Sequence, residues 1–222
     1  MKRIALPEVL PVGIEVWMIE FKFDTPCTGS DWVLLNAEEQ AHALRYHQFQ
    51  DQVRFIKTRA SLRRLLAMRL MSSPKTLHIQ ADNLGKPRLQ AYSNIEFNVS
   101  HSGHYALIAL STIGAIGIDI EYMHRDVANL EKLVFTSMER AMGYWSSSNF
   151  IELWVVKESV LKALGLGITD FLQSVTVLPN YDDSYHIILD QPSMTKIRAW
   201  SIDVVPGYTA ALALANSDGW HA

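Results

Sequence analysis

Apolar residues recur at helical spacing in two long stretches of the chain, residues 51–71 and 150–164. This spacing predicts amphipathic helices that pack on a core, and residues 137–145 are expected to form a further helix. Short apolar runs bounded by polar or glycine-containing turns predict strands. They lie at residues 14–21, 97–99, 105–110 and 116–121, and in a series of four between residues 174 and 215. The pattern predicts an α+β fold.

Two pairs of segments resemble each other. "RASLRRLL" from Arg59 aligns with "KESVLKAL" from Lys157, and "GHYALIALS" aligns with "GYTAALALA", both at an offset of about 100 residues. The shared offset predicts two pseudo-symmetric α+β halves, residues 1–114 and 115–222, with the active site in the cleft between them. Such a duplicated fold contains its own internal interface, which favours a monomer.

Composition narrows the class of protein. Of the 222 residues 49% are hydrophobic and 19% charged, and the formal net charge is −3, so a protein that coats nucleic acid or a membrane surface is not expected. Pro7, Glu8 and Pro11 interrupt the N-terminal apolar run, and no stretch is long enough to span a membrane, which indicates a cytoplasmic protein. The single cysteine, Cys27, excludes an intramolecular disulfide, and we expect it to be incidental.

Two carboxylates share one face of a predicted strand. In "GIDIE" the side chains of Asp119 and Glu121 are two positions apart and point the same way. Neighbouring carboxylates repel each other unless a cation lies between them, and hard oxygen ligands favour Mg²⁺ or Mn²⁺. A solvated strand face with two acids is the simpler alternative.

The helix "WVVKESVLKAL" carries a third carboxylate. Lys157 falls inside its apolar arc, whereas Glu158 and Lys162 lie one turn apart beyond the opposite edge. Glu158 could join the metal ligands, and the two lysines could flank a phosphate chain bound to the metal. A surface ion pair between Glu158 and Lys162, with Lys157 extended out of the arc, is the alternative.

Further candidates for anion binding lie in the first half. In "FNVSHSGHY" a strand runs into a small polar turn at Ser100 and His101, which suits a phosphate monoester. A histidine pair, His101 and His104, could instead ligate a metal, although no third ligand is apparent. Between Arg54 and Arg69 there are six cations and no acidic residue. Arg59 falls within the apolar arc of that helix and Arg63 at its edge, so Arg63 is the better placed of the two for a ligand.

The succession "GKP", "FNVSHS", "GIDIE" and "WVVKESVLKALGLG" resembles the 4′-phosphopantetheinyl transferases of the Sfp type over about residues 50–215. The most specific parts are the G-[IV]-D-x-E strand and the W-x-x-K-E-[SA]-x-x-K helix, in this order and spacing. The resemblance implies two pseudo-symmetric α+β halves with coenzyme A and Mg²⁺ in the cleft. It also implies holo-[acyl-carrier-protein] synthase activity, in which phosphopantetheine passes from coenzyme A to a serine of an apo acyl or peptidyl carrier protein and 3′,5′-adenosine bisphosphate leaves.

By matching positions, the resemblance implies a role for each candidate. Asp119, Glu121 and Glu158 would hold Mg²⁺ on the pyrophosphate, and Lys157 and Lys162 would neutralise phosphate. The nucleotide end would be bound by Ser100 and His101 at the ribose 3′-phosphate, and by Arg63 and the turn Gly85, Lys86 and Pro87.

Some points stay open. Either Glu158 or a metal-bound water could take the serine proton, with Lys162 stabilising the leaving group. Glu139 lies in "TSME", a capping-box pattern, and we favour the cap over a site role. A different Mg²⁺-dependent phosphodiesterase or phosphotransferase, or a non-catalytic coenzyme A binding module, is the alternative function. The sequence does not identify the physiological carrier.

Overall fold

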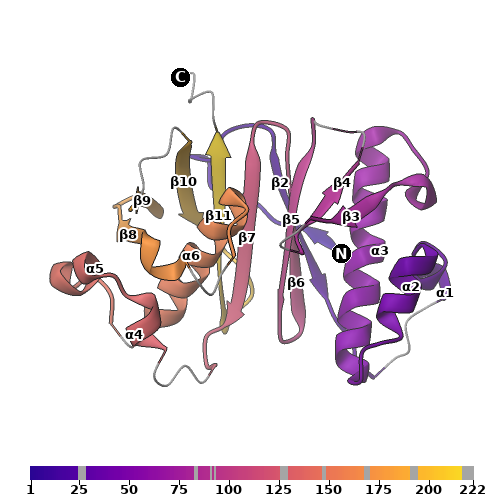
Figure 1. Cartoon of the computed structure of the whole chain (residues 1–222), viewed down its shortest axis with the longest axis horizontal. Helices are drawn as coiled ribbons and strands as arrows, with labels where there is room; N and C mark the ends of the chain where they lie inside the picture. Colours follow the sequence, from indigo (N-terminus) through magenta and orange to yellow (C-terminus); the bar gives the residue numbers. More distant parts are fainter. Residues whose placement is uncertain are drawn as a thin grey trace.

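The computed structural model describes residues 1–24, 29–82, 85–90, 92, 94–125, 130–146, 149–167, 171–190 and 195–216, so Cys27 lies outside the described residues. Two sheets lie side by side in the middle of the molecule, with the long helix α3 on the outer side of one and α6 on the outer side of the other (Figure 1). The predicted α+β fold in two halves is confirmed. Within the described ranges, no helix has the length and apolar character needed to cross a membrane.

The first sheet is antiparallel, with the strand order β1 (Lys2–Arg3), β2 (Ile14–Glu20), β6 (Tyr105–Ser111), β5 (Glu96–Ser102). Helix α3 (Phe49–Leu70) covers its outer face and packs leucines against Phe97 and Ile108. Met71, in a left-handed conformation, ends the helix. The smaller elements of this half are α1 (Gly29–Trp32), α2 (Ala37–Ala43), the 3₁₀ turn η1 (Pro74–Thr76) and the hairpin of β3 (Ile79–Ala81) and β4 (Pro87–Leu89).

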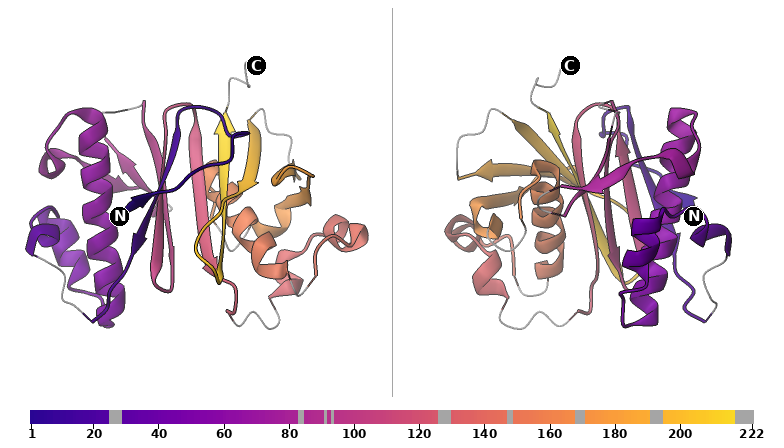
Figure 2. Two further views of the ribbon diagram at one scale, coloured as in Figure 1. Left: turned by 180° about the vertical axis from the view of Figure 1, so that it is seen from behind. Right: turned by 45° about the vertical axis from the view of Figure 1, so that its right-hand side comes forward.

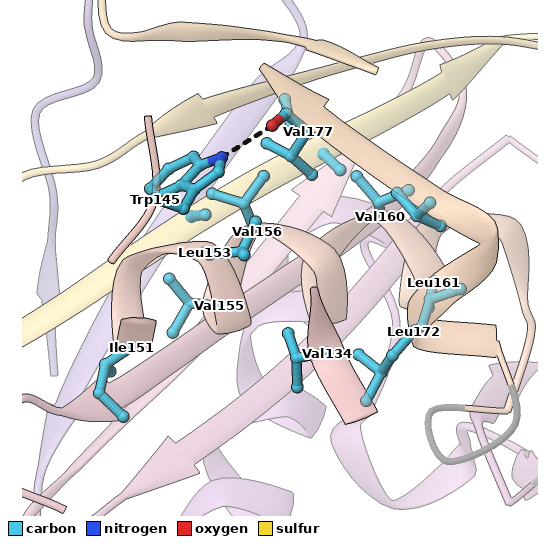
Figure 3. Close-up of a cluster of buried hydrophobic side chains, with 14 of the residues drawn as sticks. Val134, Trp145, Ile151, Leu153, Val155, Val156, Val160, Leu161, Leu172 and Val177 are labelled. Carbon is cyan, nitrogen blue, oxygen red and sulfur yellow. Dashed lines mark hydrogen bonds between the residues drawn. The ribbon is translucent and has the colours of Figure 1, made fainter. Parts of the chain in front are cut away.

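The second sheet is also antiparallel, with the order β7 (Ala115–Tyr122), β11 (Tyr208–Asn216), β10 (Lys196–Ser201), β9 (Ser184–Leu189), β8 (Val175–Pro179). Helix α6 (Phe150–Leu164) covers one face, with α4 (Glu131–Val134), α5 (Ser137–Met142) and η3 (Leu172–Ser174) around it. Figure 3 shows the apolar side chains of α6 packed with Val134, Leu172 and Val177, where the Trp145 indole donates a hydrogen bond to the Val177 carbonyl at 2.8 Å.

The inner faces of the two sheets share a core. Val16, Leu107 and Ala109 of the first sheet pack against Ile118 and Leu212 of the second, and all five side chains are buried. Along the chain, the last strand of the first sheet, β6, ends at Ser111, and the first strand of the second sheet, β7, begins at Ala115. Both views in Figure 2 place β7 beside the strands of the first sheet. At this seam Asn98 of β5 accepts a hydrogen bond from the Ile118 amide at 3.0 Å.

Candidate active site

A lysine of α6 and an aspartate of β7 form the centre of the site. Lys162 Nζ lies 2.6 Å from Asp119 Oδ1 and 3.4 Å from Glu158 Oε2, one turn back on the helix. The Ser100 hydroxyl, on β5, donates to Asp119 Oδ1 at 2.6 Å and accepts from Lys162 Nζ at 3.3 Å. The structure therefore brings Ser100, Asp119, Glu158 and Lys162 together from three elements, one of which belongs to the first sheet.

A glycine allows the close approach of α6 to β7. A Cβ at Gly117 would lie 1.9 Å from the Ser159 carbonyl oxygen and 2.5 Å from the Ala163 amide nitrogen. No side chain tolerates such contacts, so helix and strand can pack at this distance only with glycine at this position. The glycine of "GIDIE" thus sets how near Glu158 and Lys162 come to the β7 carboxylates.

Glu121 is held by two other residues. Its Oε2 accepts a hydrogen bond from the Ser102 hydroxyl at 2.7 Å, and its Oε1 forms an ion pair with Arg125 Nη1 at 2.5 Å. The Arg125 guanidinium also lies over the Trp154 ring, 5.9 Å from its centroid. Ser102 and Ser100 therefore make equivalent contacts to the two carboxylates of the β7 face.

The charges of the cluster alter its protonation. Burial, followed by the charge of Asp119, raises the pKa of Glu158 to about 7. Burial alone would lower the pKa of Lys162, but the charges of Asp119 and Glu158 outweigh it and raise that pKa, so the ammonium stays protonated. At Glu158 the effects of burial and of the Asp119 charge together outweigh the opposing effect of Lys162, and a second carboxylate of raised pKa beside Asp119 favours an added cation.

The residues present fit a hard divalent cation. Asp119 Oδ2 is buried and has no hydrogen-bond partner among the described residues, whereas Oδ1 accepts from both Ser100 and Lys162. Carboxylate oxygens are the ligands that Mg²⁺ prefers. Among the described residues, no group of three or more potential ligand side chains is close enough to hold a metal ion in the present arrangement. Instead, Lys162 binds the carboxylate of Asp119 and Arg125 binds that of Glu121. Both cationic side chains would have to shift when a metal ion binds.

Lys157 does not join this cluster. It is fully buried, and its Nζ lies 2.8 Å from Glu139 Oε2, with the carbonyls of Val134 and Leu172 at 2.6 and 3.0 Å. All its donors are therefore used within the core of the second half. The phosphate contact predicted for Lys157 is replaced by a structural ion pair, because the apolar arc of α6 faces this core and carries the lysine with it. Glu139 also forms the expected capping box with Thr136.

Arg63 is likewise structural. Its side chain is fully buried, with Nε 2.8 Å from Glu39 Oε2 and Nη1 2.7 and 3.0 Å from the carbonyls of Pro74 and Leu77. The ligand role predicted for Arg63 is corrected accordingly. Arg59, which also contacts Glu39, lines a cavity instead. The helical wheel placed Arg59 within the apolar arc and Arg63 at its edge. It could not show that Glu39, from another helix, forms a buried ion pair with Arg63.

The "GKP" turn reaches the second half. Gly85 has a φ of +82°, and Lys86 extends its Nζ to the Lys162 carbonyl at 2.6 Å and the Ile116 carbonyl at 3.4 Å. In the ligand-free protein Lys86 thus contacts the backbone of α6 and β7, and its predicted contact with coenzyme A stays a prediction. Pro87 lines the same cavity as Arg59.

Ser100 and His101 point to opposite faces of β5. Ser100 faces Asp119, whereas His101 lies beside Val99 in a cavity of about 400 Å³ between β5 and α3. Its other lining residues are Tyr46, Asp51, Arg54, Phe55, Thr58, Arg59, Leu62 and Pro87. Partial burial, then the charges of Arg54 and Lys162, lowers the pKa of His101. The predicted single phosphate site at Ser100 and His101 is thus divided between two faces.

Sequence reasoning gave no role to three residues around these two sites, Arg54, Ser102 and Arg125, and it preferred Arg63 to Arg59 as the ligand residue. The alternation of "SHS" on a strand would have placed Ser102 on the face of Ser100. Arg125 follows the strand in a turn, where no periodic pattern applies. His104, the alternative metal ligand, packs against the Phe23 ring at 5.0 Å. A larger hollow of about 910 Å³ lies beside β9 and β10, but it contains none of the candidate residues.

One protein-family model matches each half of the chain. The family described as 4′-phosphopantetheinyl transferase, N-terminal, matches residues 29–113, and the 4′-phosphopantetheinyl transferase superfamily matches residues 115–213.

Individual relatives agree with these matches. A putative 4′-phosphopantetheinyl transferase of Synechocystis sp. is 36% identical over 170 residues, which cover 72% of this chain and 68% of the relative. The 4′-phosphopantetheinyl transferase HetI of Nostoc sp. is 31% identical over 202 residues, 84% of this chain and 80% of that protein. The 4′-phosphopantetheinyl transferase Sfp of Bacillus subtilis is 26% identical over 190 residues, 83% of this chain and 84% of Sfp. This chain carries the cluster described above, Ser100, Asp119, Glu158 and Lys162. The matches to the family models and to these relatives show that the chain belongs to the 4′-phosphopantetheinyl transferase superfamily.

Proposed function

We propose that this transferase moves the 4′-phosphopantetheine group of coenzyme A to a serine hydroxyl of an apo acyl or peptidyl carrier protein, with Mg²⁺, and releases 3′,5′-adenosine bisphosphate. The observation that carries the proposal is the buried cluster of Asp119, Glu158 and Lys162, in which Asp119 Oδ2 meets no hydrogen-bond partner in the part of the chain that the structure describes. Acidic ligands beside a single protonated lysine suit a pyrophosphate that arrives together with a divalent cation.

Asp119 and Glu158 would hold the metal ion, with Glu121 as a third ligand once Arg125 turns away from it. When bound, the ion would neutralise charge on the pyrophosphate and polarise the phosphoryl group under attack. Mn²⁺ takes the same oxygen ligands and would substitute for Mg²⁺. Ser100 and Ser102 orient Asp119 and Glu121 through their hydroxyl hydrogen bonds.

Lys162 and Glu158 divide the work of charge and proton. The carrier serine oxygen bonds to the β-phosphorus, and the bond from that phosphorus to the bridging oxygen breaks, so that the adenosine bisphosphate leaves with the bonding pair. The Lys162 ammonium stabilises the charge on the departing phosphate. Glu158 would accept the serine proton through the carboxylate oxygen that does not bind the ion. Its pKa of about 7 belongs to the protein without the ion, and a bound cation would favour the ionised carboxylate that a base needs.

The cavity on the other face of β5 suits the nucleotide end. His101 of β5 and Arg54 and Arg59 of α3 line this cavity, and their nitrogen atoms suit a 3′-phosphate through charge-assisted hydrogen bonds. Tyr46 and Phe55 add aromatic surface for a base. Pyrophosphate and 3′-phosphate would then bind on either side of one strand, with Ser100 and His101 as neighbours in sequence.

The test is the incubation of the purified protein with coenzyme A, MgCl₂ and an apo acyl carrier protein, followed by the intact mass of the carrier. We expect the mass of one phosphopantetheine group to be added, and a carrier whose acceptor serine is replaced by alanine to stay unmodified. Coenzyme A hydrolysed with water as the sole acceptor would instead identify a phosphodiesterase. Coenzyme A bound but never consumed would identify a binding module.

A further inference from the structure

Lys86 belongs to the first half of the chain, but its side chain ends on the second. It is the last residue of the turn between β3 and β4, which form a hairpin that lies between α3 and the central strands (Figure 1). Its Nζ donates to the Lys162 carbonyl at 2.6 Å and lies 3.4 Å from the Ile116 carbonyl. One ammonium group therefore joins the hairpin to both α6 and β7.

The turn is built to hold this lysine in place. The Asp82 amide donates to the Lys86 carbonyl at 2.8 Å, and the Asp82 carboxylate accepts from the Lys86 amide at 2.9 Å. Gly85 supplies a positive φ of 82° and donates its amide to the Asp82 carbonyl at 2.9 Å. Because the Lys86 backbone is fixed at both its amide and its carbonyl, its side chain projects in a defined direction.

The acceptor is the C-terminal end of α6. The Lys162 carbonyl also accepts the amide of Gly165, the residue that ends the helix in a left-handed conformation with φ 70°. Carbonyls of the last helical turn carry partial negative charge, and a cation there is favourable. Desolvation of the Lys86 ammonium makes these contacts necessary, because a partly buried charge needs partners.

Lys162 is thus contacted at both its backbone and its side chain. Its carbonyl receives Lys86 from the first half, while its side-chain nitrogen binds Asp119 in the candidate site. We propose that Lys86 is a positioning residue, which fixes the last turn of α6 to the β3–β4 hairpin and thereby holds the Lys162 ammonium at the pyrophosphate site. The kinetic part of this inference rests on the proposed function, and the structural part does not.

The test compares Lys86→Met, which keeps the apolar stem, with Lys86→Arg, which keeps a cationic donor. Lys86→Gln serves as a second neutral variant should the methionine variant fold poorly, and Lys75→Met, at an exposed lysine of η1, is the matched control. Hydrogen exchange of the ligand-free proteins, followed by mass spectrometry, is measured for residues 79–89 and for the last turn of α6. We expect both segments to exchange faster together in Lys86→Met and Lys86→Gln, but not in Lys75→Met.

In the transfer assay we expect kcat to fall by between about tenfold and a hundredfold in Lys86→Met, with little change in the KM for coenzyme A, and to recover in part in Lys86→Arg. Unchanged exchange would overturn the inference, as would unchanged kcat. A loss confined to KM would also overturn it, because it would return Lys86 to direct ligand contact. If the wild type transfers nothing, the proposed function fails, and the exchange measurement still decides whether Lys86 fixes the helix.

Discussion

Glu39 and Glu139, a hundred residues apart, both cap a short helix and bind a buried cation of the long helix in their own half of the chain. Each is buried and closes a capping box, Glu39 with Asn36 at the start of α2 and Glu139 with Thr136 at the start of α5. Each then binds a fully buried cation of the long helix in its half, Arg63 in α3 and Lys157 in α6. The repeated sequence offset therefore has a physical counterpart, a glutamate that ties a short helix to the long one.

The first prediction concerns this ion pair in the second half. Lys157→Met leaves Glu139 buried without its cation, so we expect a loss of about 3 kcal/mol in the free energy of unfolding, measured with urea. Transfer by the folded fraction should stay close to that of the wild type, because Lys157 contacts none of the site residues. The exposed Lys132→Met is the control.

A double-mutant cycle sharpens this test. Lys157→Met combined with Glu139→Gln should destabilise less than the sum of the single changes, since the two side chains interact directly. A Lys157→Met protein of normal stability that transfers poorly would return this lysine to the phosphate site.

The second prediction concerns Asp119. Asp119→Asn keeps the shape of the side chain but removes its charge, so we expect transfer to fall by about 100-fold or more. Mn²⁺ should also bind more weakly to the Asp119→Asn protein than to the wild type, as measured by titration calorimetry without coenzyme A. Asp182→Asn, at an exposed acid remote from the cluster, should leave both unchanged. Near-normal transfer at limiting Mg²⁺ would remove Asp119 from the ligand set.

The third prediction concerns Arg125, which occupies one oxygen of Glu121. A metal ion at Glu121 has to displace this partly exposed guanidinium, and an exposed ion pair contributes at most about 1 kcal/mol. Arg125→Gln should therefore tighten Mn²⁺ binding to the ligand-free protein by up to about fivefold, and less so in high salt. Arg140→Gln controls for the loss of a positive charge elsewhere. Weaker binding in Arg125→Gln would show that Arg125 supports the metal site.

Periodicity predicted the parts of this molecule that repeat. Helix α6 has the predicted bounds, and the alternation of "GIDIE" correctly placed Asp119 and Glu121 on one face, with buried isoleucines on the other. The fold class follows from such patterns because burial of an apolar face determines how a helix or strand lies.

Periodicity could not predict the partner of each buried cation. Lys157 and Arg63 both lie on or near apolar arcs, which is compatible with a ligand or with a buried carboxylate. Which of the two applies depends on Glu139 and Glu39, which come from other helices. Their positions are set by tertiary structure and cannot be read from the periodicity of one helix. Lys86 is a similar case, because its acceptor, the Lys162 carbonyl, is a backbone atom that carries no sequence signal.

The last prediction separates the two faces of β5 by means of pH. Partial burial and the charges of Arg54 and Lys162 lower the pKa of His101, so in the ligand-free protein its imidazole is neutral at about pH 7.5 and gains a proton only below its ordinary pKa of about 6.5. Protonation adds a charge-assisted contact to a 3′-phosphate, so the preference for coenzyme A over dephospho-coenzyme A, as a ratio of kcat/KM, should rise by about tenfold as the pH falls from about 7.5 to 5.5. The phosphate itself takes up a proton near pH 6, but this affects wild type and variant alike. In His101→Asn the ratio should be smaller and should not rise, whereas Ser100→Ala, on the opposite face, should lower kcat and keep the pH dependence of the ratio. An undiminished rise in His101→Asn would show that another group, with Arg59 the first to examine, senses the 3′-phosphate.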